Sequence, residues 1–423
     1  MILQLAWRNI WRNPVRSLVI IISVAAGLFA ALAVLALYDG MMISRLRTVI
    51  DTETGHLQVH DPGFKDDMEP RYVIKNQARW AILLDKDPAI KCWSSRVVSS
   101  GMLATPSGSA GVQVNGINSG KEMPVSGIYG KLLRGLGNSS EQVAVSSKQS
   151  RSVDTGLGLT DGRSILIGRK LATKLKLSLG NKVVLTMTDK DANMVSSAMR
   201  IRGIYESANT PLDELNVYVS EKELAETLGV PGSIHELAII LKSDDSVSAV
   251  QHRYSSLFPG DRVESWKELS PETNLMIDTV DLYSYIIVII ILIALSFGIV
   301  NTMLMSVLER RKEIGMMAAL GIGKKRLLLM VLTETIFLSL VGVPIALGIG
   351  WLAVSYYHKN GLDLSGMGEE LMKSFGYESL IYPTYPSDKI PAIILLVLIS
   401  AILASIFPSL KSVNIKPAEA LQK

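Results

Sequence analysis

The chain has 423 residues, of which 48% are hydrophobic and 19% are charged, and its formal net charge is +4. A mean hydropathy of +0.30 is too high for an ordinary soluble enzyme and is typical of membrane helices combined with a folded polar domain. Nucleic-acid binding is not indicated, because the sequence contains no clustered basic face. The single cysteine, Cys92, excludes an intramolecular disulfide bond, and we expect it to be a buried, unreactive thiol.

The N-terminal segment, residues 1–17, predicts a helix in the membrane interface. Trp7 and Trp11 are four residues apart, as are Arg8 and Arg12, so an aromatic stripe would lie beside a basic one. Residues 18–38 then form an apolar stretch about 20 residues long, which crosses a bilayer as a helix. It is too long for the apolar part of a typical signal peptide and lacks a cleavage site, so we expect an uncleaved first transmembrane helix.

A polar region of mixed pattern, residues 39–281, follows the first helix. Its alternating and capped segments indicate an α+β domain inserted between the first two transmembrane helices, with two lobes because of its size. Ser220 and Glu223 predict a capping box. The Gly-, Ser- and Asn-rich residues 101–162 are expected to form loops. The expected strands are 56–59, 182–187, 199–204, 216–219 and 236–241, and the expected helices are 168–177 and 220–228.

Patterns for catalysis or metal binding are missing from this domain. Its histidines, His56, His60, His235 and His252, have neither an H-E-x-x-H nor a C-x-x-C context. No serine has the G-x-S-x-G frame, and Gly-Ile-Gly-Lys at 321–324 lacks the spacing of a Walker A motif. We therefore expect no catalytic residue and no metal site, and any ATP to be hydrolysed by another chain.

Three further apolar stretches complete a set of four predicted transmembrane helices. The short segments before the first helix, between the second and third, and after the fourth hold twelve basic residues against three acidic ones. The positive-inside rule therefore places both termini in the cytoplasm and the large domain outside it. The later segments are helix two (282–308), a loop with a short helix (309–326), helix three (327–354), an acidic outer loop (355–389), helix four (390–410) and a tail (411–423).

The loop at 309–326 combines a charged start with an apolar end. Ile314, Met317, Ala318, Leu320 and Gly321 would form a compact apolar side of a short helix. Such a helix suits insertion into a groove on a partner. A solvated loop whose charges fix the topology is an equally good interpretation.

Glu334 lies about two turns inside helix three, where an acid is costly and is usually paired or functional. We expect a structural ion pair with Arg326, which lies eight residues earlier on the same face. Stripes of small residues predict close helix contacts. They are Ser23, Gly27 and Ala31 in helix one, Gly298, Thr302 and Ser306 in helix two, and Gly342, Ala346 and Gly350 in helix three.

Three segments together resemble the FtsX-like, or macrolide-exporter type, permeases of ABC transporters. They are Leu-Ala-Trp-Arg-Asn-x-Trp-Arg-Asn-Pro at 5–14, Glu-Arg-Arg-Lys-Glu-Ile-Gly-x-x-x-Ala-Leu-Gly at 309–321, and a proline-flanked end with Pro-x-Glu-Ala-Leu at 408–421. A weaker likeness covers 167–180 in the inserted domain. The length and the large inserted domain are most similar to those of the lipoprotein-releasing transmembrane subunits.

The resemblance implies a permease in the bacterial inner membrane that pairs with a second copy or a paralogue and with two cytoplasmic ATPase subunits. The partner would bind ATP and magnesium, and this chain would bind no cofactor itself. Closure of the ATPases would tilt helices one and two and move the outer domain, a mechanism called mechanotransmission, and would pass lipoproteins to a periplasmic carrier. The implied ATPase contacts are Glu309, Arg310, Arg311, Lys312, Glu313, Ile314, Gly315, Ala319, Leu320 and Gly321.

In this interpretation, helices one and two face a cavity that acyl chains enter, and its walls would include Phe29, Ile291, Leu295 and Ile299.

Other functions remain open. They are an exporter with a periplasmic adaptor and an outer-membrane duct, a regulator of a cell-wall hydrolase, and a membrane-bound enzyme, which the missing catalytic groups disfavour. Acyl-chain crosslinking to helices one and two would support the first interpretation, and copurification of an adaptor would support export.

Overall fold

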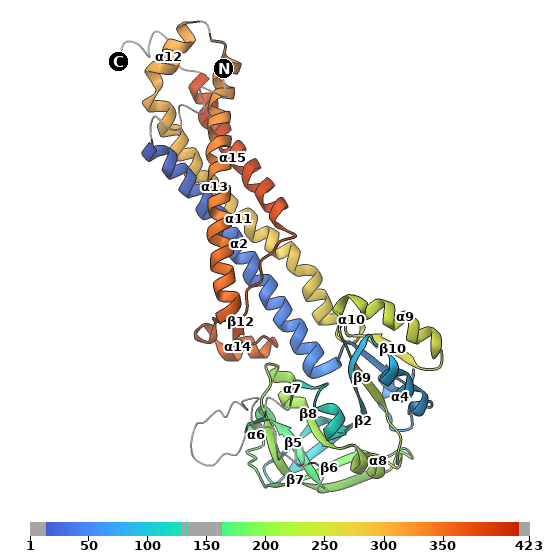
Figure 1. The fold of residues 1–423 in the computed structure, drawn as a ribbon. Helices are drawn as coiled ribbons and strands as arrows, with labels where there is room; N and C mark the ends of the chain where they lie inside the picture. Colours follow the sequence, from blue (N-terminus) through green and yellow to red (C-terminus); the bar gives the residue numbers. More distant parts are fainter. Residues whose placement is uncertain (1–13, 129–131, 134–158, 160–162, 321, 414–423) are drawn as a thin grey trace. The chain divides into compact units, whose positions relative to one another are not determined.

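A computed structural model describes residues 14–128, 132–133, 159, 163–320 and 322–413 (Figure 1). The predicted interfacial helix and the C-terminal motif therefore lie outside the described residues. The chain divides into two compact units. We call Met1–Ile43, Ile277–Asp363 and Leu380–Lys423 the helical unit, and Ser44–Met276 with Leu364–Ser379 the sheet unit.

The helical unit contains four helices that are long and apolar enough to cross a membrane, counted over the described part of the chain. They are α2 (Pro14–Val49), α11 (Pro271–Glu309), α13 (Lys324–Asn360) and α15 (Ile390–Val413). Side chains from all four meet in one apolar core, for example Leu28, Val288, Leu338 and Val397. The first three helices have 36, 39 and 37 residues, well beyond the ~20 that a bilayer core requires.

The small residues of α13 allow it to pack closely against α2. A β-carbon on Gly342 would lie 3.1 Å from the Ile21 carbonyl oxygen of α2, and one on Gly350 would lie 3.1 Å from Leu32. The predicted stripe on helix three is therefore a packing surface against α2. The stripe on helix two differs, because Gly298 has no neighbouring atom within 4 Å among the described residues.

The sheet unit is built on a mixed sheet. Its strand order is β10-β1-β9-β2-β3-β8-β5-β7-β4, with β6 paired to β2 and β7. Only the pairs β3–β8 and β5–β7 are parallel among those described. This mixed sheet and its short helices lie in the chain between the first two long helices. The predicted fold class, long membrane helices with an inserted α+β domain, is therefore confirmed. The strands are β1 (Leu57–His60), β2 (Ile90–Thr105), β3 (Gly108–Ile117), β4 (Leu132–Leu133), β5 (Ser164–Gly168), β6 (Lys182–Thr188), β7 (Met194–Tyr205), β8 (Asn216–Ser220), β9 (Glu236–Leu241) and β10 (Arg262–Ser265).

Short helices cover this sheet. Two main apolar clusters form on it, one around Trp80 and Tyr254 and the other around Leu171 and Leu224. The helices are η1 (Ile50–Thr54), α3 (Phe64–Asp67), α4 (Gln77–Lys86), α5 (Ser119–Glu122), α6 (Arg169–Lys174), α7 (Thr210–Leu215), α8 (Glu221–Thr227), η3 (Asp244–Ser246), α9 (Val247–Leu257) and α10 (Trp266–Leu269).

The alternating segments predicted as strands are all strands, within a few residues of their expected ends. The predicted capping box is wrong, because Ser220 precedes α8 but makes no side-chain cap. Glu223 instead accepts a hydrogen bond from the backbone N–H of Arg163. The capping box occurs at Ser265 and Glu268, at the start of α10.

The expectation of loops at 101–162 is wrong for its first part. Residues up to Ile117 belong to the long antiparallel hairpin of β2 and β3. A β-carbon at Gly101 of this hairpin would come within 2.9 Å of the Thr186 carbonyl oxygen of β6, so the close approach favours glycine here. Glycine in a strand can therefore mark a close approach of two backbones.

Gly168 shows the same effect most strongly. A β-carbon at this position would lie 2.0 Å from the backbone oxygen of Asp213 in α7. We predict that Gly168→Ala lowers the free energy of unfolding by about 3 kcal/mol or more, because backbone atoms cannot yield to the added methyl group. The measurement is the thermal unfolding midpoint of the full chain, followed by tryptophan fluorescence.

The matched control is Gly111→Ala in β3, where no atom lies within 4 Å of the added carbon. This change should leave the midpoint unchanged or slightly raised, because it only restricts the unfolded chain. Equal midpoints for the two variants would contradict the close-contact explanation of Gly168.

The segment between the third and fourth long helices contributes to both units. β11 (Leu362–Asp363) and β12 (Leu380–Ile381) pair in the helical unit, while η4 (Ser365–Met367) and α14 (Glu369–Ser374) belong to the sheet unit. There the Lys373 ammonium lies 3.0 Å from the Glu206 carboxylate, and the Arg45 guanidinium occupies the space beside Gly376. Gly376 has a φ of 75°, which also favours glycine.

Candidate functional site

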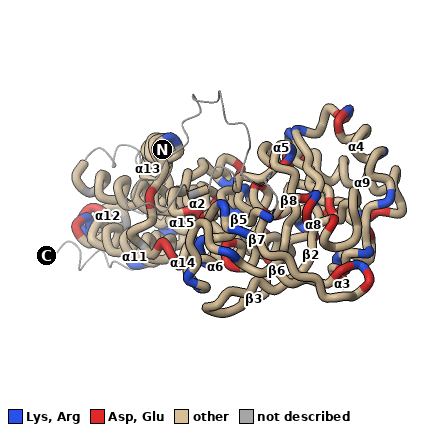
Figure 2. Tube along the Cα trace, turned by 90° about the horizontal axis from the view of Figure 1, so that it is seen from below, with Lys and Arg blue, Asp and Glu red and all other residues tan. Residues whose placement is uncertain are grey.

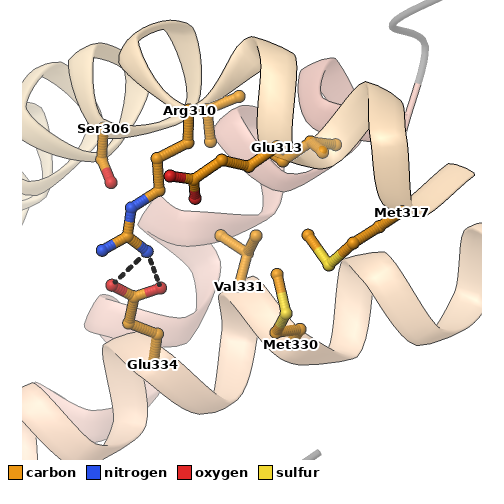
Figure 3. Close-up of a pocket in the computed structure, with 9 residues that line it drawn as sticks. Ser306, Arg310, Glu313, Met317, Met330, Val331 and Glu334 are labelled. Carbon is orange, nitrogen blue, oxygen red and sulfur yellow. Dashed lines mark hydrogen bonds and ion pairs between the residues drawn. The ribbon is translucent and has the colours of Figure 1, made fainter. Parts of the chain in front are cut away.

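The candidate site is the turn where α11 ends and α12 (Arg311–Ala319) begins (Figure 3). The N–H of Ile314 donates to the carbonyl of Arg310 at 3.0 Å, so the new helix starts directly after this residue. The charged run 309–313 therefore surrounds the turn. A helix end that carries its polar residues at a turn can place some of them inside the bundle and others outside it.

Arg310 points into the bundle and meets Glu334 of α13. Its Nη1 atom lies 3.2 Å and 3.3 Å from the two carboxylate oxygens, and the two residues are only 8% and 5% exposed. Arg326, the predicted partner of Glu334, is exposed. Glu334 therefore forms an ion pair with Arg310 and not with the predicted partner Arg326.

A small cavity of about 20 Å³ adjoins this ion pair, which is room for about one water molecule. Figure 3 shows Glu313 reaching toward it from α12, with Met317, Met330 and Val331 closing the other side. The buried ion pair is thus bordered by the polar Glu313 on one side and by the apolar Met317, Met330 and Val331 on the other. Removing one charge of such a pair is costly, because the other stays buried without its counter-ion.

The apolar residues predicted to form one side of α12 are divided between a face that packs on the bundle and a face that is exposed. Ile314 is buried and Met317 packs against the bundle core, so neither is available to a partner. Leu320, a member of the predicted side, is 78% exposed, and Met316, which was not predicted, is 52% exposed. Such an exposed apolar pair at the end of a helix is a candidate contact surface.

The other residues implied at the ATPase contact fall into three groups. Glu309, Lys312 and Ala319 are exposed, and Arg311 and Glu313 are half-buried. Gly315 is buried together with Arg310 and Ile314. Gly321 lies outside the described residues. The implied set therefore mixes side chains that hold α12 to the bundle with side chains that face away from it.

The residues expected to line an acyl-chain cavity do not form one surface. Ile299 is fully buried in the core of this chain, and Leu295 packs against Gly27 of α2. Phe29 and Ile291 are half-buried. Among the exposed apolar side chains of α11, four follow another stripe, namely Ile286, Ile290, Ile293 and Phe297.

No three His, Cys, Asp or Glu side chains gather as a metal site among the residues that the structure describes. His235 is fully buried, with Nδ1 accepting from the Val98 N–H and Nε2 donating to the Pro70 carbonyl, both at 3.0 Å. Its ring stacks on Phe64. Burial lowers the pKa of His235, so the neutral ring is the form that fits this site.

This lowered pKa predicts a loss of stability in mild acid. As the pH falls through about 6.5, the unfolded chain binds a proton at His235 while the folded chain does not. The stabilisation is therefore complete above this pH and decreases below it, by at most about 1.4 kcal/mol per pH unit. Thermal midpoints between pH 7.5 and 5.5 should fall more steeply for the wild type than for His235→Gln, and parallel slopes would refute the assignment.

Cys92 lies in β2, half-buried, and its thiol donates to the Pro124 carbonyl at 3.2 Å. Burial raises the pKa of this thiol, which reduces the thiolate fraction at neutral pH. This setting is consistent with the predicted unreactive thiol, although the Cys92 side chain is half-buried and not buried as predicted.

Charges are distributed without a face of one sign in the described chain. Figure 2 shows basic and acidic residues close together around α12 and intermixed over the strands and short helices of the sheet unit. Long tan stretches mark the apolar helices. At the α11–α12 turn, the ion pair that the structure gives joins Arg310 to Glu334 of α13.

Comparisons with known proteins agree with this architecture. The family model "MacB-like periplasmic core domain" matches residues 17–257, which is more than half of the chain, and "FtsX-like permease C-terminal" matches 285–417. The second match contains the α11–α12 turn and Glu334. The sequence is 22% identical over 306 residues to an uncharacterized ABC transporter permease protein, Rv0987, of Mycobacterium tuberculosis, covering 69% of this chain and 34% of that protein.

A second relative is the macrolide export ATP-binding/permease protein MacB of Bdellovibrio bacteriovorus, 30% identical over 166 residues, which are 37% of this chain and 25% of that protein. The chain thus spans about a third and a quarter of the lengths of these two relatives. The periplasmic region of MacB from Actinobacillus actinomycetemcomitans aligns with a TM-score of 0.34 and 16% identity, over 55% of this chain and 97% of that one. The chain is a multi-pass membrane protein and belongs to the ABC transporter permeases of the FtsX and MacB type.

Proposed function

We propose that this chain is the non-catalytic permease subunit of an ABC transporter that works by mechanotransmission in the bacterial inner membrane. ATP would be hydrolysed on a partner subunit, with the termini and α12 in the cytoplasm and the sheet unit outside it. The observation that carries the proposal is the exposed pair Met316 and Leu320 on a helix whose other face is anchored by the buried Arg310–Glu334 pair.

This arrangement suits the transfer of force. An ATPase groove would take the exposed apolar pair, while the anchored face would pass the displacement to α11 and α13. α11 has 39 residues, so it extends about 58 Å as a continuous rod. Its first residues belong to the sheet unit, and movement of α11 would therefore reach that unit along covalent structure.

The test is copurification with an ATPase subunit. Tagged protein would be extracted in detergent, and partners with Walker A sequences would be identified by mass spectrometry. Met316→Glu/Leu320→Glu should remove the ATPase, because burying two carboxylates in an apolar groove is unfavourable. Met194→Glu is the control, since Met194 is 78% exposed in the sheet unit, far along the chain from α12.

Retention of the ATPase by the double variant would reject α12 as the contact. This variant is preferable to charge reversal at Glu309 and Glu313, because Glu313 lines the cavity beside Arg310 and its replacement would disturb the fold.

For the cargo we propose lipoproteins or other lipid-anchored molecules, handed to a periplasmic carrier and handled with a second permease copy. The exposed stripe of α11 offers apolar side chains that an acyl chain would contact. A benzophenone amino acid at Phe297 should crosslink a lipoprotein acyl chain, and one at Trp351, exposed on α13, should not.

A second candidate is export of small molecules with a periplasmic adaptor. The observation that favours it is the similarity to MacB, whose name describes macrolide export. Efflux of a macrolide, with no acyl crosslink at Phe297, would select this candidate. A lack of both would favour the regulation of a cell-wall hydrolase.

A further inference from the structure

The sheet unit contains a cavity of about 270 Å³ that the proposed transport function does not use. Its floor is one face of the neighbouring strands β1, β9, β2, β3 and β8. Its cover comes from η1, α3, α7 and α10. The lining includes Gln58, His60, Lys65, Arg96, Gln113, Asn115, Asn216, Tyr218 and Glu236 with the apolar Phe64, Met68, Leu212 and Leu269.

Strand register explains why so many polar groups share this face. Directly paired residues of a sheet point to the same side, and the pairs Arg96–Glu236, Asn115–Tyr218 and Gln113–Asn216 all do so here. A row of polar side chains therefore crosses five strands. On the same strands, apolar residues point into the cores on the opposite side.

The charged groups at the cavity are already paired. Arg96 contacts Glu122 at 2.7 Å and Glu236 at 2.9 Å, and Lys65 contacts Glu264 at 3.2 Å. A ligand with a strong charge would therefore find no free counter-ion, and it would lose its hydration on entry. The site favours a neutral ligand.

Glu53, the remaining acid in the lining, accepts from Asn209 and lies 3.5 Å from the Arg45 guanidinium. This acid therefore also has a cationic partner within the chain, and it offers no unpaired charge to a cationic ligand.

The uncharged polar groups, in contrast, are incompletely used. The Gln58 amide and the Tyr218 hydroxyl line the cavity and make no hydrogen bond to any described residue. Their polar atoms are not sealed off inside the chain, so they reach the open space of the cavity. Both groups can therefore bond a molecule that enters it.

A chain of amides adds further free positions. Gln113 Nε2 donates to Asn115 Oδ1 at 3.2 Å, and Asn115 Nδ2 donates to Asn216 Oδ1 at 2.9 Å. Within the described residues this leaves an amide oxygen of Gln113 and an amide nitrogen of Asn216 for a ligand. A ligand that both donates and accepts, as hydroxyl groups do, would satisfy these amides together with Gln58 and Tyr218.

We propose that this cavity binds one small, neutral, polyhydroxylated molecule of about the size of a monosaccharide. Its hydroxyl groups would bond Gln58, Tyr218 and the amide row, and its C–H groups would lie against the apolar residues of the cover. The volume is slightly below the ~300 Å³ at which pockets for larger ligands begin, which limits the ligand to a single ring.

The test is direct titration of the full-length protein in detergent by calorimetry. The probes are glucose, galactose, mannose and N-acetylglucosamine, each up to 10 mM, with glycerol as a control for nonspecific effects. At least one sugar should bind and glycerol should not. A soluble tetrasaccharide of that sugar distinguishes two sources of the ligand, a free monosaccharide and the end of a polysaccharide. A free monosaccharide as ligand predicts binding of the monosaccharide alone. A polysaccharide end predicts binding of both probes.

Two near-isosteric variants remove one polar group each, Gln58→Met and Tyr218→Phe. Each should weaken binding about five- to tenfold, as expected for one buried hydrogen bond. Tyr254→Phe is the matched control, because the buried Tyr254 hydroxyl donates to the Asp87 carboxylate and neither residue lines the cavity. It should lower the thermal midpoint without a comparable loss of affinity.

The proposal is overturned if no sugar binds, or if a sugar binds equally well to wild type and to both cavity variants. Loss of ATPase copurification would leave these affinities unchanged, so the two proposals fail independently.

Discussion

Replacing Arg310 with methionine is expected to lower the free energy of unfolding of the helical unit by about 3–5 kcal/mol. The reason is that Glu334, only 5% exposed, would remain buried without its counter-ion. The anchored face of α12 would also loosen, so under the proposed function the same variant should no longer stimulate the ATPase subunit. Unfolding in mixed detergent and ATPase assays in nanodiscs would measure the two effects.

The control is the double variant Arg310→Met/Glu334→Leu. Removing both charges leaves an apolar pair of similar volume, and stability should return to within about 1–2 kcal/mol of the wild type. If the double variant is as unstable as the single one, the loss comes from packing of the arginine stem rather than from an unpaired charge.

The second large effect is expected at Arg96 in the sheet unit. Its guanidinium donates through Nε and Nη2 to Glu122, and through Nη1 to Glu236 and to the Glu53 carbonyl. Arg96→Met should cost about 3–5 kcal/mol, because the buried carboxylate of Glu122 and the half-buried one of Glu236 lose their partner. Arg96→Lys should recover only part of this, since an ammonium cannot reproduce the planar fork.

Fluorescence of the buried Trp80 would follow this unfolding in the full chain. Arg71→Met is the matched control, because Arg71 pairs with Glu69 at 2.5 Å but is largely exposed. Exposed pairs contribute only about 0–1 kcal/mol, so this variant should melt close to the wild type. Similar losses at both positions would show that burial does not decide the effect.

The sequence predicted the features that depend on local composition. Length and hydropathy indicated four membrane helices, and alternation along β6 and β9 indicated strands. The resemblance at 309–321 pointed to the segment that forms the α11–α12 turn. These signals lie within one element each, so no long-range contact is needed to read them.

The partner of Glu334 shows what such local reasoning misses. Spacing along a single helix favoured Arg326, whereas the pair forms across the turn, from Arg310 to α13. A signal was present, since an arginine directly after a long apolar helix can fold back into the bundle. Choosing between several arginines of one charged run, however, requires the three-dimensional position of the turn.

Arg96 was missed for a related reason. It is one arginine beside the apolar Val97 and Val98, which would mark a buried charge, but its partners are far away in the sequence. Glu122 lies 26 residues on and Glu236 lies 140 residues on. Gly101 of the β2–β3 hairpin misled in the opposite direction, because its close contact with β6 is invisible without the sheet order.

The segment between β11 and β12 has a mechanical consequence. Because residues 364–379 belong to the sheet unit, the backbone passes between the two units four times rather than twice. A body tethered at two points can swivel about the line that joins them, whereas four tethers oppose that rotation.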